Sequence, residues 1–282
     1  MNIGVSLSFT ANTPRPEVLA ARCEELGFET LFVPTFYALP ANYGTTLSSS
    51  EVYAGVLDSF CVLQMAATVT SRLKVGTGVY PLPWSDPFHL ANRARTLALY
   101  SGGRFVFGVG AGESDNPAGG RAMSAAQRWS IVAEYVRVIK QLWSTPRAGF
   151  RGRWVSFAPH PRASLLPLCP RPPILIGAGA VGRLASQRAL RNTVALAEGW
   201  APVAINPRRL SGQVARLKRM CAEAGRDFST VDISVFAPQE APTPRRTIEL
   251  YAAAGAHRLV FVRQPPMVSI QALELLARNY LA

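Results

Sequence analysis

Cysteine and histidine are scarce in this chain of 282 residues, and the shortage excludes whole classes of site. The 4 cysteines lie far apart and form no Cys-x-x-Cys pair, so we expect neither a zinc site nor a disulfide framework. We interpret them as buried thiols. The 3 histidines form no His-x-x-x-His pair, and we therefore predict no metal centre.

Long apolar runs are also missing. No stretch approaches the roughly 20 apolar residues that a membrane-spanning helix needs. Met1 leads almost directly into Ile3-Gly4-Val5-Ser6-Leu7, with no charged leader and no cleavage site. We expect a cytoplasmic protein that has no membrane partner.

Acidic residues are few, at 17 against 30 basic ones, and the net charge is +13. Lysine is rarer still, because only Lys74, Lys140 and Lys218 occur and the other 30 − 3 = 27 basic residues are arginines. The surplus suits an anionic partner, either nucleic acid or a highly charged small molecule, or it marks an arginine-rich solvated surface. No recognised nucleic-acid module is visible, so we predict no nucleic-acid partner.

What the chain does contain is a regular alternation of strands and helices. The expected strands are 3–7, 30–33, 73–79, 104–109, 174–176, 199–201, 232–236 and 258–262. The expected helices are 14–26, 51–70, 86–100, 125–143, 183–191, 207–224, 244–254 and 269–281. This repeated unit predicts an α/β fold, a closed (β/α)₈ TIM barrel in a single domain over residues 1–282. A doubly wound sheet is the alternative.

Residues 144–173 interrupt the alternation with proline, arginine and aromatic residues. We read this segment as an insertion between the fourth helix and the fifth strand, with a hairpin over 150–155. Because it begins after a helix, it starts from the end of the barrel opposite the catalytic one. We expect it to serve packing or oligomerisation, with a homodimer as one option.

The stretch from Ser101 to Glu113 organises the expected active site. A Ser-Gly-Gly turn precedes a strand of β-forming residues, which is typical of a strand buried on both faces. Gly108, Gly110 and Gly112 then alternate with small residues, as they do where a backbone or ligand approaches closely, or where strand and helix pack tightly. Glu113 follows at the carboxyl end of the strand, where TIM barrels place their active sites.

Six stretches carry a family pattern in order along the chain. They are residues 24–29, 73–79, 101–112, 173–177, 198–200 and 253–258. Together they resemble the bacterial luciferase-like superfamily, and within it the flavin- or deazaflavin-dependent oxidoreductases. The resemblance covers nearly the whole chain and implies the same barrel.

The resemblance implies a tricyclic cofactor across the carboxyl ends of the strands. In this family the third strand carries a bulge, often with a non-prolyl cis peptide, which here would fall on Gly78-Val79; an ordinary strand glycine is the alternative. The family binds the cofactor phosphate with backbone amides after the fifth strand. The matching residues here are Gly177, Ala178, Gly179 and Ala180. Small residues that open a helix leave amides free for an anion, although a simple strand-to-helix turn would look alike.

The segment Gly112-Glu113-Ser114-Asp115-Asn116 resembles the deazaflavin-dependent sugar-phosphate dehydrogenases. That resemblance implies a proton-transfer role for Glu113 and cofactor binding by Asn116. Beside an apolar ring the pKa of Glu113 would rise, as general acid-base catalysis requires, whereas a solvated loop acid is the alternative.

The chain departs from the family pattern at the end of the second strand. Relatives often carry an acid-His pair there, but this chain has Val33-Pro34-Thr35-Phe36-Tyr37. In place of that pair, Thr35 is expected to contact the cofactor, and both Thr35 and Tyr37 can donate hydrogen bonds.

Three further residues are polar or aromatic candidates. Arg263, at the end of the eighth strand, either binds an anionic substrate or phosphate group or is a surface arginine. We interpret His89 and Trp200 as structural.

We therefore predict an oxidoreductase that transfers a hydride between coenzyme F420 and a small organic substrate. The anionic tail of F420 suits the net charge of +13. An FMN-dependent monooxygenase on the same barrel and a cofactor-binding homologue without turnover are the alternatives. The loop 36–50 is expected to shape a fairly apolar substrate pocket.

Overall fold

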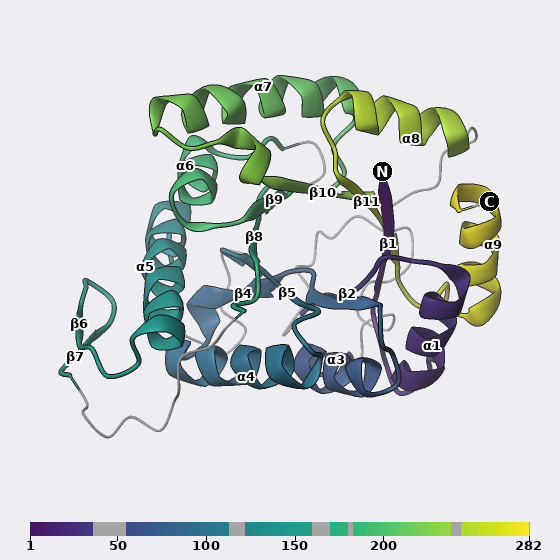
Figure 1. Ribbon diagram of the computed structural model, residues 1–282, viewed down its shortest axis with the longest axis horizontal. Coiled ribbons are helices and arrows are strands. Elements are labelled where there is room, and N and C mark those ends of the chain that lie inside the picture. The colour runs from purple at the N-terminus through teal and green to yellow at the C-terminus, as the bar shows by residue number, and fades with distance from the viewer. Residues whose placement is uncertain (36–54, 113–121, 160–169, 180–182, 238–243, 282) are drawn as a thin grey trace.

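The computed structural model describes residues 1–35, 55–112, 122–159, 170–179, 183–237 and 244–281. Its parallel strands pair in the order β3-β2-β1-β11-β10-β9-β8-β5, and pairing of β3 with β5 closes the ring (Figure 1). This closure confirms the predicted barrel and rules out an open doubly wound sheet. The division into one domain stays a prediction.

The strands that form the barrel agree closely with those expected. They are β1 (Asn2–Leu7), β2 (Thr30–Val33), β3 (Lys74–Thr77), β5 (Phe105–Gly110), β8 (Ile174–Gly177), β9 (Gly199–Ala201), β10 (Asp232–Ala237) and β11 (Arg258–Arg263). A two-residue strand, β4 (Tyr80–Pro81), follows β3 and also pairs with β5. The sequence patterns did not predict β4, because two residues are too short for a periodic signal.

Helices surround this barrel. They are α1 (Pro16–Leu26), α3 (Ser59–Thr68), α4 (Pro87–Tyr100), α5 (Ala125–Ser144), α6 (Gln187–Leu196), α7 (Pro207–Glu223), α8 (Pro244–Ala253) and α9 (Ile270–Tyr280). Two short 3₁₀ helices, η1 (Leu82–Trp84) and η2 (Phe228–Thr230), lie in the connections. Among the described helices, none combines the length and the hydropathy needed to cross a bilayer.

Two predicted helix starts were wrong, and capping explains both. The helix expected over 51–70 begins only at Ser59, because the Asp58 side chain accepts a hydrogen bond from the Cys61 amide (3.0 Å) and ends the extended segment. The helix expected over 183–191 runs from Gln187 to Leu196, since Ser186 caps it in the same way. Side-chain caps therefore decided where these helices begin.

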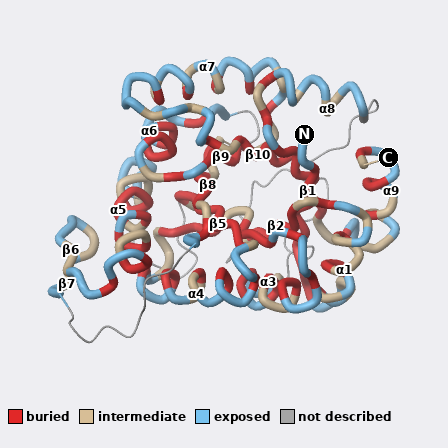
Figure 2. The backbone as a smooth tube through the Cα atoms, in the orientation of Figure 1, coloured by how far each residue is buried: buried red, intermediate tan, exposed pale blue. Residues whose placement is uncertain are grey.

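The core has two parts, separated by the wall of the barrel. One part lies between strands and helices, and the other fills the lumen with Phe32, Val106, Leu175, Ala201, Phe236 and Val260. The rings of Phe32 and Phe236 meet inside the barrel with centroids 5.0 Å apart. Figure 2 shows buried strands enclosed by helices whose outer faces are exposed. The lumen is therefore packed rather than open, as in other TIM barrels.

The insertion lies between α5 and β8, as predicted. Its hairpin consists of β6 (Phe150–Arg151) and β7 (Ser156–Phe157), paired antiparallel. Phe150, Val155 and Phe157 pack against the core, so the packing role is confirmed. The hairpin itself stands beside α5 at the periphery of the molecule (Figure 1).

The interpretation of the cysteines as buried thiols was correct for Cys23 and Cys221 and wrong for Cys61. Cys61 lies in the first turn of α3 and is exposed, because it falls on the outward face of that helix. Cys169 lies outside the described residues.

Candidate functional site

Side chains inside the barrel become smaller toward the carboxyl ends of β5 and β8. Val106 and Leu175 fill the lumen. Because successive strand residues face opposite sides, Gly108 and Gly110 follow Val106 on the lumen side, and Gly177 follows Leu175. Gly112 and Gly179 come just after the ends of these two strands. We call this glycine-lined carboxyl end the mouth of the barrel.

The third strand carries a bulge at the mouth, as predicted. Gly76 pairs with Val106 and Tyr80 with Val109, so three residues on one strand face two on the other. The peptide bond Gly78–Val79 within it is cis, which confirms the expected position. The Thr77 hydroxyl donates a hydrogen bond to the carbonyl oxygen of Gly108 (2.7 Å), so this backbone group is satisfied inside the bulge.

Val79 projects from this bulge into the space that the glycines leave. A Cβ on Gly177 would lie 2.7 Å from Val79 Cγ1, and one on Gly110 would lie 3.0 Å from Cγ2. At Gly108 a Cβ would collide with the Thr77 carbonyl oxygen. In the described part of the chain, these glycines therefore make room for the protein's own third strand, which packs closely against β5 and β8. Val79 itself remains partly exposed.

Gly112 is needed for a different reason. Its backbone is left-handed (φ 64°), and a Cβ there would lie 2.9 Å from the Trp84 ring. Any other residue at this position would strain the backbone and displace the Trp84 ring, so glycine is favoured where the chain leaves β5. Glu113 follows directly, but Glu113 and Asn116 lie outside the described residues, as do Ala180 and Tyr37.

Two polar groups at the mouth have no partner among the described residues. The hydroxyl of Ser8, at the carboxyl end of β1, is 1% exposed and makes no hydrogen bond there. The amide of Gly179, a residue with φ 95°, has no acceptor in the described ranges. The amide of Ala178, by contrast, donates to the Ala201 carbonyl oxygen (3.3 Å). The Gly179 amide is therefore better suited than the Ala178 amide to donate a hydrogen bond to an anion at this end.

The structure places the remaining sequence candidates as follows. Thr35 lies at the carboxyl end of β2, with its hydroxyl 2.7 Å from that of Ser59 at the start of α3. Trp200 is buried, and its indole donates to the Ala178 carbonyl oxygen (3.1 Å), which agrees with a structural role. His89 has an 87% exposed side chain beside Asp86.

Arg263 fits neither of its two sequence interpretations. It is 3% exposed, so it is not a surface arginine. It lies on the same face of β11 as Leu259 and Phe261, which belong to the core between strands and helices. Strand alternation therefore directs Arg263 away from the lumen, and its Nη1 donates to the Val262 carbonyl oxygen (3.0 Å).

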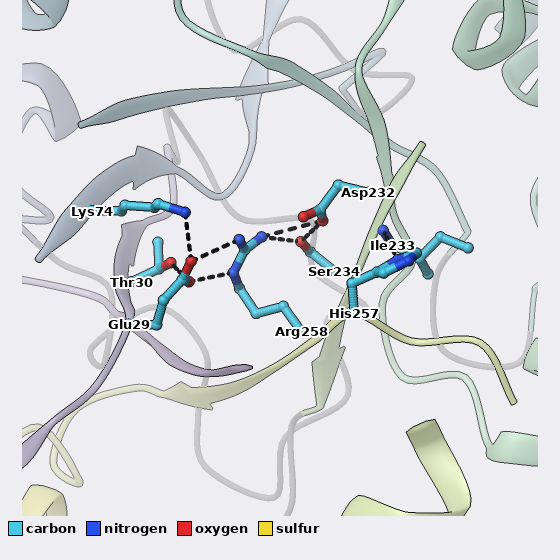
Figure 3. A network of polar contacts seen from close by, with 8 residues as sticks. All are labelled: Glu29, Thr30, Lys74, Asp232, Ile233, Ser234, His257 and Arg258. Atoms are coloured by element: carbon cyan, nitrogen blue, oxygen red, sulfur yellow. Dashed lines mark hydrogen bonds and ion pairs between the residues drawn. The ribbon is translucent and has the colours of Figure 1, made fainter. Parts of the chain in front are cut away.

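The opposite, amino end of the barrel holds a network of charged side chains that the sequence analysis missed (Figure 3). The Arg258 guanidinium is 4% exposed and binds Glu29 at 2.6 Å and Asp232 at 3.2 Å. Lys74 Nζ also contacts Glu29, at 2.7 Å. Burial opposes ionisation of Glu29, but the hydrogen bonds and charge of Arg258 outweigh it and lower the pKa of Glu29 to about 2.

A sequence signal for this network existed. Lys74, Asp232 and Arg258 each begin a strand, and parallel barrel strands begin at the same end. A cavity of about 130 Å³ lies beside the network, lined in part by these three side chains. Since TIM barrels carry their chemistry at the other end, we interpret the network as a structural closure of the barrel.

The comparisons with known proteins agree with this geometry. An uncharacterised protein of Mycobacterium tuberculosis is 29% identical over 236 residues, which covers 80% of each chain. An F420-dependent secondary alcohol dehydrogenase superposes with a TM-score of 0.79 at 16% identity, over 99% of this chain and 98% of that one. The monooxygenase RslO1 from Streptomyces bottropensis superposes with a TM-score of 0.73 at 19% identity, over 100% and 99%. At such identities these two structures establish the fold.

The model of the family described as luciferase-like monooxygenase matches residues 3–253. The match spans all the barrel strands except β11, together with the bulge and the glycine-lined mouth. The chain belongs to the luciferase-like monooxygenase family.

Proposed function

We propose that this chain is an oxidoreductase that transfers a hydride between the deazaflavin coenzyme F420 and a small organic substrate. The observation that carries the proposal is the mouth of the barrel, where glycines on β5 and β8 leave Val79 as a partly exposed apolar surface. A flat aromatic ring binds well to an apolar surface from which few side chains project. The carboxyl end of the barrel is also where this fold places its chemistry.

The polar groups at the mouth fit such a ligand. The Ser8 hydroxyl is buried without a partner among the described residues, so it is suited to bond a polar edge of the ring. The Gly179 amide, just before the segment that leads into α6, is suited to an anionic phosphate. Thr35 adds a hydroxyl at the end of β2. We also assign backbone contacts with the cofactor to four small residues, Gly78, Gly177, Ala178 and Ala180.

The cofactor would supply the hydride-carrying carbon, and the chain's own residues would orient it and exclude water. We assign proton transfer to Glu113 and a cofactor contact to Asn116, on the resemblance of residues 112–116 to the deazaflavin-dependent dehydrogenases. A carboxylic acid at the carboxyl end of β5 would stand close to any ligand in the mouth.

The choice of F420 over FMN rests on charge and on overall likeness. A net charge of +13 favours a cofactor with an extended anionic tail. The full-length likeness to an F420-dependent alcohol dehydrogenase supports the same choice. An FMN-dependent monooxygenase is the second candidate, because a monooxygenase also superposes over the full length.

The decisive experiment is a fluorescence titration of the purified protein with F420 and, separately, with FMN. We expect tight F420 binding, weakened about tenfold or more by Gly179→Ala. Gly225→Ala is the matched control, because Gly225 also has a positive φ (66°) but follows α7 at the other end of the barrel. If both variants weakened F420 binding equally, Gly179 would not be a specific contact of the cofactor.

The remaining outcomes separate the alternatives. Preference for FMN would favour the monooxygenase, and binding of neither cofactor would contradict the proposal. Glu113→Gln should retain F420 binding and lower kcat by about a hundredfold if Glu113 transfers the proton. F420 binding without turnover of any alcohol, aldehyde or ketone in a broad panel would indicate a binding homologue.

A further inference from the structure

Three arginines from three different elements surround a hollow on the outer wall of the barrel. Arg137 comes from α5, Arg188 from α6 and Arg153 from the turn of the β6–β7 hairpin. The hollow has a volume of about 380 Å³. It lies between α5, α6 and the hairpin that stands beside α5 in Figure 1. We call it the arginine hollow.

Among the described residues, one carboxylate lines the hollow, and it is already bonded to backbone amides. Glu134, which is 7% exposed, accepts hydrogen bonds from three successive amides of the hairpin turn. The distances are 2.9 Å from Arg153, 2.6 Å from Trp154 and 2.7 Å from Val155. Gly152 permits this contact, since a Cβ there would collide with the carboxylate. Glu134 therefore holds the hairpin, and with it Arg153, against α5.

Among the described residues, no carboxylate forms an ion pair with any of the three guanidinium groups. Within the described ranges, no carboxylate oxygen lies within 4.0 Å of the guanidinium nitrogens of Arg137, Arg153 or Arg188, although other arginines of the chain do form such pairs. With three arginines and one glutamate, the lining carries 3 − 1 = +2. All three arginines are exposed, so water screens their mutual repulsion, but the uncompensated positive charge attracts an anion.

Two of the arginines are held in place by other contacts. Arg188 Nη1 donates to the Ala126 carbonyl oxygen at 2.8 Å, and the Arg153 guanidinium lies 5.0 Å from the centre of the Trp154 ring. The Trp154 indole in turn donates to the Ser130 hydroxyl at 3.1 Å. This restraint lowers the entropy lost when a ligand binds.

We propose that the arginine hollow binds a compact organic dianion bearing phosphate or carboxylate groups. Guanidinium groups match both groups with paired hydrogen bonds, and the net charge of +2 matches two negative charges. Trp129 and Trp154 add aromatic surface for an apolar part of the ligand. The volume is at the small end of the range for ligand sites. The site lies outside the barrel wall and does not depend on the cofactor proposed for the mouth.

The test is isothermal titration calorimetry of the full chain with three probes at constant ionic strength. Phenyl phosphate and isophthalate are aromatic dianions that distinguish phosphate from carboxylate recognition, and phenol is the neutral control. We expect saturable one-site binding of at least one dianion and none of phenol. Arg137→Gln and Arg153→Gln should each weaken it about tenfold. Arg219→Gln, on the exposed face of α7, is the matched control and should change it less than about twofold.

Two results would overturn the proposal. One is the lack of saturable binding of either dianion up to about 10 mM, a concentration at which even weak specific sites fill. The other is an equal loss in all three arginine variants, which would indicate non-specific attraction to a basic surface. Thermal unfolding of each variant, compared with the parent protein, verifies that the fold is intact.

Discussion

Arg258 and Glu29 form a two-pronged ion pair across the amino end of the barrel, although 229 residues separate them in the chain. Arg258 Nε lies 2.6 Å from Glu29 Oε2, and Nη2 lies 3.1 Å from Oε1. Arg258 begins β11 and Glu29 immediately precedes β2, and these two strands pair with β1 on either side. A Cβ on Gly4 of β1 would lie 3.0 Å from the Thr30 carbonyl oxygen, which is a tight contact, and 3.6 Å from Arg258 Cδ, which is an ordinary one. Glycine at this position therefore relieves the Thr30 backbone beside Glu29.

Glu29→Gln should lower the free energy of unfolding by about 3 kcal/mol, because it removes the main charge partner of a buried guanidinium. Arg22→Gln is the matched control. Arg22 pairs with Glu274 at 2.6 Å, but both side chains are about one third exposed, so its loss should cost less than about 1 kcal/mol. Urea unfolding followed by circular dichroism measures both values. Equal losses would mean that the network does not close the barrel.

Stability should also fall in acid through Glu29. The folded-state pKa of about 2 lies below the value of about 4.3 expected in the unfolded chain. The stabilisation, roughly 3 kcal/mol at most, is therefore complete above pH 5 and is lost as the pH falls toward 2. Melting temperatures of the parent and Glu29→Gln proteins should converge over this interval. Parallel curves would show that Glu29 does not contribute.

Gly177→Ala should destabilise the protein by about 1–3 kcal/mol, because the added methyl group overlaps Val79. Val79→Ala removes the overlapping atoms, so the double variant should recover part of that loss. A double-mutant cycle from urea unfolding measures this coupling.

The control for that cycle is Gly212→Ala. A Cβ on Gly212, within α7, meets no atom within 4 Å, so alanine should stabilise the helix by about 0.5–1 kcal/mol. Opposite signs at Gly177 and Gly212 would support the account of the mouth. Strictly additive effects of Gly177→Ala and Val79→Ala would contradict it.

Glu134→Gln should release the β6–β7 hairpin. Each amide bonded to an ionised carboxylate contributes about 1.5–3 kcal/mol, and the neutral amide side chain accepts more weakly. Hydrogen exchange at Arg153, Trp154 and Val155 should accelerate about tenfold or more. Glu249→Gln, whose partner Arg245 lies 3.8 Å away on the exposed face of α8, should leave these amides unchanged.

Much of the fold was predictable because its signals are local. Apolar runs and turn residues located the barrel strands, and proline, arginine and aromatic residues marked the insertion. The bulge at Gly78-Val79 followed from a family pattern of consecutive residues. Helix starts at Ser59 and Gln187 were missed, since a single capping side chain outweighed the periodicity there.

The sequence predicted where in the barrel the candidate site lies, but not which residues contact one another there. Topology alone puts Thr35, Val79 and Gly177 at the carboxyl ends of their strands. That Val79 fills the space above three glycines, or that the Ala178 amide is bonded to Ala201, depends on how strands separated in sequence pair. The roles of Glu113 and Asn116 stay predictions.

The amino-acid sequence by itself determined the order of elements, the closed barrel class and the family, because periodicity and consecutive motifs act over a few residues. Only the tertiary structure decided that Arg258 forms an ion pair with Glu29 and that Arg263 lies on the helix-facing side of its strand. It also decided that three arginines line one hollow. These depend on closure of the barrel, which brings distant strands and helices within a few ångströms and so sets which charges and side chains meet.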